Sequence, residues 1–170
     1  MNRHPGHDYS APGYYFVTIS TAGYRSIFGR LGTDNRIVLS NIGWIAEQVW
    51  QRNDQIYSSF RNDVYCFMPN HLHALVQIES DGKSDESPPN LSTVIRSFKG
   101  CVTKEVRRHG GRPDLVIWQH NFHDRIVRSD RSLAAIRNYI ANNPGALESR
   151  IDDLLGTGNL LPGPRWPGED

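Results

Sequence analysis

Residues 64–78, VYCFMPNHLHALVQI, decide the fold class of this chain. Two apolar runs stand on either side of Pro69-Asn70, and this arrangement predicts a β-hairpin. In a strand, side chains at i and i+2 project to the same face, so His71 and His73 point together. The hairpin therefore places two imidazoles side by side on a rigid strand, which is two thirds of a facial metal site.

The segments around this hairpin alternate between strand and helix patterns. Aromatic and β-branched runs predict strands at 14–21, 36–39, 64–68, 71–78, 116–118 and 125–127. Apolar residues at helical spacing predict helices from Ser40 to Tyr57, from Asn90 to Gly110-Gly111, and from Ser129 or Asp130 to about Asn143. We therefore expect an α+β fold, an antiparallel or mixed sheet with helices packed mainly on one face.

The composition fits one compact domain in a cytoplasmic protein. Apolar residues make up 38% of the 170 residues, which is enough for a core. No run approaches the roughly 20 apolar residues of a membrane span, and the N-terminus lacks a secretion signal. Cys66 and Cys101 are expected to be reduced core thiols. We divide the chain into a flexible N-terminus (1–13), a compact domain (14–146) with an acidic loop (79–89), and an acidic Gly/Pro-rich tail (147–170).

Basic residues concentrate in one part of the chain. The segment from Arg96 to Arg137 holds ten Lys and Arg against four acids, a local charge of +6 in a chain whose net charge is +1. This asymmetry favours a basic face for a polyanion, although solvated helix faces produce similar counts.

A second group of polar residues lies on the third predicted helix. Tyr139 and Asn143 are four residues apart, so the phenol and the carboxamide share one face of that helix. An amide oxygen is a ligand suited to Mg²⁺ or Mn²⁺, and a phenol beside it can attack what the metal holds. Asn142 competes for the ligand role. The structural alternative is a tyrosine packed at a helix surface and an asparagine that ends the helix.

Four strings of the sequence, in their order and spacing, resemble a known family. They are FMPNHLHALV (67–76), LSTVIRSFKG (91–100), IWQHNFHDRIVRS (117–129) and IRNYIANNP (136–144). The pattern resembles the bacterial HUH single-strand transposases of the insertion-sequence-200-like type, and especially the REP-associated tyrosine transposases. The resemblance covers about residues 14–146. It implies a ferredoxin-like catalytic domain in which His71 and His73 are metal ligands, Tyr139 is the nucleophile and Asn143 is the third ligand.

The function that the resemblance implies is a metal-dependent endonuclease and strand transferase for single-stranded DNA. The expected cofactor is Mg²⁺ or Mn²⁺, the intermediate a 5′-phosphotyrosine, and the partner single-stranded or hairpin DNA such as a REP element, with a monomer and a homodimer both open. We expect DNA contacts from basic residues and from side chains that stack on bases: Lys99, Lys104, Arg107, Arg108, Arg125, Arg128, Trp118 and His123. Three alternatives remain: a rolling-circle-type nickase or relaxase, a domesticated DNA-binding protein without turnover, and a ferredoxin-like domain that binds Zn²⁺ through the two histidines.

Overall fold

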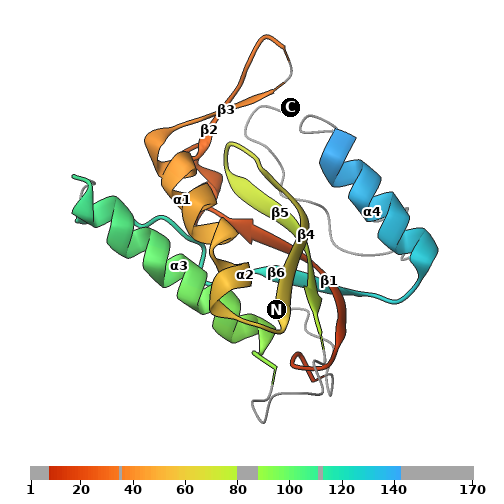
Figure 1. Cartoon of the computed structure of the whole chain (residues 1–170). Helices are drawn as coiled ribbons and strands as arrows, with labels where there is room; N and C mark the ends of the chain where they lie inside the picture. The colour runs from red at the N-terminus through yellow and green to blue at the C-terminus, as the bar shows by residue number, and fades with distance from the viewer. Residues whose placement is uncertain (1–7, 35, 80–87, 111–112, 143–170) are drawn as a thin grey trace.

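The computed structural model describes residues 8–34, 36–79, 88–110 and 113–142. The predicted tail, most of the predicted acidic loop, and Asn143 lie outside the described residues. In the part that is described, one sheet lies between two layers of helices (Figure 1).

The main sheet has four strands in the order β4-β5-β1-β6, and each neighbouring pair is antiparallel. Its strands are β1 (Gly13–Ser20), β4 (Phe60–Phe67), β5 (His71–Ile78) and β6 (His123–Val127). A separate hairpin joins β2 (Gly29–Leu31) to β3 (Ile37–Leu39). The expected antiparallel sheet and its hairpin at Pro69-Asn70 are confirmed. Sequence patterns do not predict β2, because Gly29–Leu31 contains no β-branched or aromatic residue.

The helices lie mainly on one face of the sheet, as expected. α1 (Asn41–Gln51) and α3 (Leu91–Arg108) cover that face, whereas α4 (Asp130–Asn142) covers the opposite one (Figure 1). The short α2 (Asn53–Ile56) follows α1, and a 3₁₀ turn spans Ala22–Tyr24. No helix in the described part of the chain is both long enough and apolar enough to cross a membrane.

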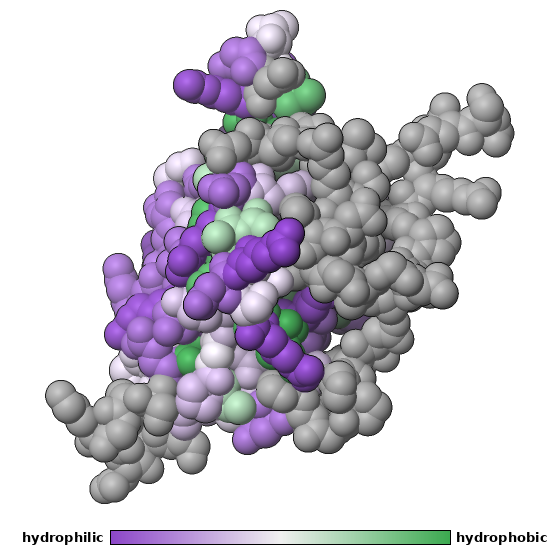
Figure 2. All heavy atoms as spheres, turned by 90° about the vertical axis from the view of Figure 1, so that its right-hand side faces the viewer, coloured by the Kyte–Doolittle hydropathy of each residue, from purple (hydrophilic) through white to green (hydrophobic). Residues whose placement is uncertain are grey.

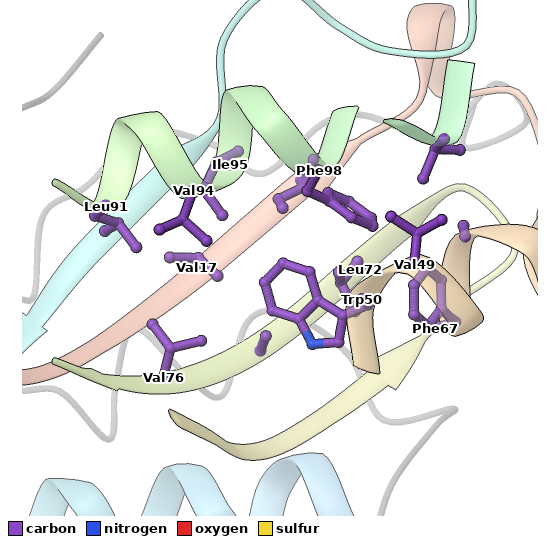
Figure 3. Close-up of a cluster of buried hydrophobic side chains, with 14 of the residues drawn as sticks. Val17, Val49, Trp50, Phe67, Leu72, Val76, Leu91, Val94, Ile95 and Phe98 are labelled. Atoms are coloured by element: carbon purple, nitrogen blue, oxygen red, sulfur yellow. The ribbon is translucent and has the colours of Figure 1, made fainter. Parts of the chain in front are cut away.

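The larger core fills the space between the sheet and the α1/α3 layer. Trp50 of α1 and Phe98 of α3 meet over the sheet near Leu72 of β5 (Figure 3). The two aromatic rings meet edge to face, with their centroids 4.9 Å apart. Because side chains alternate along a strand, Leu72 faces this core while its neighbours His71 and His73 face α4.

A smaller apolar cluster fixes α4 to the other face of the sheet. It consists of Phe16 and Leu75 from the sheet and of Ile136 and Ile140 from α4, all buried. Seen from the side of α4, the described surface is mainly hydrophilic, with small apolar areas (Figure 2). The apolar cluster that holds α4 on the sheet is smaller than the core beneath α1 and α3.

The predicted helix starts are confirmed by side-chain caps. Ser40 Oγ accepts a hydrogen bond from the Gly43 amide, and Asn90 Oδ1 accepts one from the Ser92 amide. These caps satisfy amides that have no partner within the helix itself.

Three local expectations differ from the structure. The helix predicted from Ser40 to Tyr57 is interrupted at Arg52, which separates α1 from α2. The segment 116–118 forms only an isolated bridge between Thr21 and Trp118 instead of a strand. Both cysteines are free, but Cys101 is exposed rather than in the core, because the buried stripe of α3 passes through its neighbours Phe98 and Val102.

Candidate active site

The two histidines begin β5 and are buried on the sheet face that α4 covers. His71 is 5% exposed and His73 is 6% exposed, and their ring centroids lie 4.4 Å apart. His71 Nδ1 lies 2.7 Å from Asn70 Oδ1, and His73 Nδ1 lies 2.9 Å from Thr18 Oγ1. Hydrogen bonds at Nδ1 orient an imidazole, and a ring held in this way coordinates a metal through Nε2.

Burial keeps both imidazoles neutral near pH 7. It lowers the pKa of His71 to about 4. The pKa of His73 falls well below the ordinary value of a histidine, through burial first and then through the neighbouring His71. The neutral imidazole is the form that binds a metal ion. The pair is thus in the state that ligation requires.

Tyr139 lies beside this pair although it comes from a distant part of the chain. Its ring centroid is 6.0 Å from that of His73, at an interplanar angle of 69°. On the same sheet face, the ring of Phe16 stacks on His73 with a centroid distance of 5.3 Å. Ile136 and Ile140 anchor the helix that carries Tyr139. The structure therefore brings together three of the four residues expected at the site.

The fourth expected residue follows directly after the last described residue of the chain. Asn143 lies outside the described residues, and the same holds for the side chain of its competitor Asn142. Within the described ranges, no group of three or more His, Cys, Asp or Glu could hold a metal ion.

Two of the expected DNA-binding residues share the sheet face of the histidines. The strand register places His123 opposite Thr18 and Arg125 opposite Phe16, and both partners face α4. His123 is exposed and Arg125 is half-buried. Arg128 is exposed just after β6, which is an edge strand of the sheet.

The basic residues of α3 lie on the other side of the sheet. They border an open groove of about 580 Å³, which we call the α3 groove. Its lining residues are Arg96, Lys99, Gly100, Thr103, Lys104, Arg107, Trp118, Gln119 and His120. The helices α3 and α4 cover opposite faces of the sheet (Figure 1). The sheet therefore separates the α3 groove from the histidine pair. Sequence patterns could not show this separation, since they give no order of the layers.

Three of the expected DNA contacts are already engaged in contacts within the chain. Lys99 Nζ donates hydrogen bonds to the carbonyls of Gln119 and Asn121, both at 2.9 Å, and burial lowers its pKa to about 8. Trp118 Nε1 donates to the Lys99 carbonyl at 3.1 Å, and its ring packs against core aromatic residues. Arg108 forms an ion pair with Glu105 at 2.7 Å. Lys104 and Arg107 are exposed in the groove.

Sequence patterns do not single out the residues that orient the site. Thr18 and Asn70 hold the two imidazoles, yet neither belongs to a recognisable ligand motif. Asn70 directly precedes His71, and this adjacency in the turn was the available signal. Arg137, on the same helix as Tyr139, forms an ion pair with Asp63 of β4, which no sequence motif indicates.

Comparison with known proteins confirms the resemblance to the REP-associated tyrosine transposases. No protein-family profile matches the chain. An uncharacterized protein of Haemophilus influenzae is 28% identical over 153 residues, which cover 81% of this chain and 83% of that protein. A second protein of the same organism, named "Putative REP-associated tyrosine transposase", is 27% identical over 89 residues, or 50% of this chain and 49% of that protein.

A REP-associated tyrosine transposase is also found among the solved structures that resemble this chain. A REP-associated tyrosine transposase bound to a REP hairpin has a TM-score of 0.57 and 18% sequence identity to this chain. The match covers 85% of this chain and 73% of that protein. At this level of identity the likeness establishes the fold, and it confirms the expected α+β class.

Proposed function

We propose that this chain is a transposase that cleaves and rejoins single-stranded DNA through Tyr139. The observation that carries the proposal is the position of Tyr139, whose ring centroid lies 6.0 Å from that of the buried His73. The confirmed resemblance to a family named for a tyrosine supports the same assignment.

The residues present fit a divalent cation. His71 and His73 are neutral, adjacent and held at Nδ1, and the amide of Asn143 is the proposed third ligand. Two imidazoles with one neutral oxygen leave positions open for substrate, and Mg²⁺ or Mn²⁺ are the proposed ions. When bound, such an ion supplies Lewis-acid stabilisation of charge on a phosphate.

The proposed reaction is a reversible transfer of a phosphodiester bond. The Tyr139 oxygen forms a bond to phosphorus while the bond from phosphorus to the 3′ oxygen breaks, and that oxygen leaves as a 3′-hydroxyl with one proton. The 5′ end stays bound to Tyr139 as a phosphotyrosine. A free phenol has a pKa of about 10, so its proton must leave before or during the attack. The bond energy is retained in the protein–DNA bond, and a 3′-hydroxyl can therefore reverse the reaction without ATP.

The proposed substrate is hairpin DNA with an unpaired segment. The fold is shared with a transposase that was solved with a REP hairpin. The α3 groove, lined by Arg96, Lys104 and Arg107, offers positive charge for phosphates. On the face of the histidine pair, Arg125 and His123 are the proposed contacts for the scissile strand. The DNA would then contact both faces of the sheet.

The test is incubation of the protein with matched single-stranded and duplex oligonucleotides that carry a genomic palindrome, with Mg²⁺, with Mn²⁺ and with EDTA. We expect cleavage of the single strand alone, and only with a divalent cation. Cleavage of duplex DNA, or full cleavage in EDTA, would contradict the proposal. Binding without cleavage under every condition would support the domesticated DNA-binding protein instead.

A further inference from the structure

Arg137 of α4 forms a two-pronged ion pair with Asp63 of β4. Its Nε lies 3.1 Å from Asp63 Oδ1 and 2.9 Å from Oδ2, and its Nη2 lies 2.5 Å from Oδ2. The same Nη2 is 3.4 Å from the hydroxyl of Tyr14, and the guanidinium lies 5.5 Å from the centroid of the Tyr14 ring. Arg137 thus connects α4 to an edge strand and to a central strand of the sheet. The planar guanidinium fork makes such a contact directional.

An irregularity in β4 provides the position of Asp63. The register between β4 and β5 shifts between Asn62 and Val64, so Asp63 is an extra residue in the strand. Asn62 donates a hydrogen bond to the backbone of α1, whereas Val64 packs in the cluster under α4. Residues two apart in a regular strand face the same side, and the bulge removes this constraint. The extra residue therefore lets Asp63 reach α4 without turning Val64 away from it.

Arg137 and Tyr139 lie on opposite flanks of the buried stripe of α4. That stripe passes through Leu133, Ile136 and Ile140. At about 100° per residue, Arg137 falls on one side of the stripe and Tyr139 on the other. Apolar contact is not directional, so the stripe alone allows the helix to roll about its axis. A directional contact on one flank limits this roll and thereby fixes the side chain on the other flank.

We propose that Asp63 and Arg137 are positioning residues that hold α4 at the roll angle where Tyr139 meets His73. The inference rests on the proposed function of Tyr139, and it adds that this ion pair orients the nucleophile. A nucleophile misplaced by about 1 Å costs on the order of a hundredfold in rate. The pair acts through α4 and does not touch the reacting atoms.

The test compares Arg137→Met and Asp63→Asn with Arg131→Met, which removes an exposed arginine from the first turn of the same helix. Methionine keeps much of the apolar stem of arginine and removes the fork. With saturating oligonucleotide, we expect the single-turnover rate of covalent adduct formation to fall on the order of a hundredfold in both pair variants. Oligonucleotide affinity should stay within a factor of about two, and Arg131→Met should keep the wild-type rate.

Charge reversal separates positioning from general destabilisation. The double variant Asp63→Arg/Arg137→Asp restores the attraction with the partners exchanged, and we expect it to recover about tenfold in rate over Arg137→Met. Unchanged adduct rates in both single variants would overturn the inference. A fall in rate that merely follows a loss of oligonucleotide affinity would overturn it as well.

Amide hydrogen exchange tests the same inference without any cleavage. We expect the amides of α4 to exchange faster in Arg137→Met and Asp63→Asn than in Arg131→Met, with α3 unchanged in all three. If the wild-type protein forms no adduct, the proposed function fails and the exchange of α4 alone decides the inference. Identical exchange of α4 in the wild type and both pair variants would overturn the positioning role.

Discussion

The two histidines are unusual residues for the strand in which they lie. Seven of the eight residues of β5 are buried, and His71 and His73 are the polar ones among these seven. A buried polar ring costs stability unless its polar atoms are satisfied, and Asn70 and Thr18 provide hydrogen bonds at Nδ1. A purely structural strand would gain from apolar residues at both positions, which favours a functional role for the pair.

The substitution Tyr139→Phe isolates the nucleophile. It removes one hydroxyl from a half-buried ring, so we expect the free energy of unfolding to change by at most about 1 kcal/mol. Hairpin affinity should be unchanged, while cleavage should be lost because water would not be positioned for attack. Thermal unfolding, DNA binding and a cleavage gel measure the three quantities. Cleavage at the wild-type rate would exclude Tyr139 as nucleophile.

The substitution His71→Ala tests the role of the metal. We expect it to abolish cleavage but to leave hairpin binding largely intact, because phosphate contacts supply affinity independently of the metal. A calorimetric titration with Mn²⁺ should show that the variant binds the ion more weakly than the wild type does. Wild-type cleavage by His71→Ala in EDTA would be the contrary result.

The pKa of Lys99, about 8, predicts a pH dependence of DNA binding. The ammonium is charged below this value and loses its proton as the pH rises, so affinity should weaken between pH 7 and pH 9. The loss of one positive charge from the α3 groove corresponds to about 1 kcal/mol, or roughly fivefold in Kd. Lys99→Arg keeps its charge over this range and should bind with a constant Kd. Equal pH profiles for the two proteins would remove Lys99 from the DNA interface.

Among the elements, α3 combines a buried stripe with a basic groove on its accessible side. The buried stripe includes Val94, Phe98, Val102 and Val106. Gly100 belongs to the lining of the α3 groove, and a Cβ atom at this position would meet only open space. A glycine inside a helix costs roughly 1 kcal/mol relative to alanine. An accessible position without a side chain lets a ligand approach the helix backbone, and this fits a surface that contacts a DNA backbone.

The salt dependence of binding tests the α3 groove. The double variant Lys104→Ala/Arg107→Ala removes two exposed charges from the groove. Each lost contact should reduce the slope of log affinity against log salt by about 0.7 for single strands and about 0.9 for a duplex stem. The control is Arg30→Ala/Arg52→Ala, which removes the same charge from exposed positions outside the groove and should keep the slope. Equal slopes in both double variants would show that Lys104 and Arg107 do not contact DNA phosphates.

For the molecule as a whole, the sheet divides the expected functional residues between two faces. Tyr139 lies beside His73 of its own chain, and we propose that one chain supplies both parts of the site. We therefore expect a mixture of Tyr139→Phe and His73→Ala proteins to form no adduct. The measurement is a denaturing gel of the mixture with labelled single strands. Formation of an adduct in the mixture, when neither variant forms one alone, would show that subunits exchange the helix α4.

Local patterns account for much of the fold and of the site, and their failures have physical reasons. The alternation around His71 and His73 and the caps at Ser40 and Asn90 depend on neighbouring residues, which a sequence displays. The separation of the α3 groove from the histidine pair depends on the order of the layers. The Asp63 contact depends on a bulge that brings residues distant in sequence together, and no local pattern encodes it.

The proposed reaction leaves Tyr139 covalently bound to DNA. Mass spectrometry of the trapped protein–DNA product, after digestion of both components, locates the modified residue among the seven tyrosines. We expect a single nucleotide-bearing peptide, with the phosphate on Tyr139. A phosphate on any other tyrosine, or cleavage without any covalent product, would contradict it.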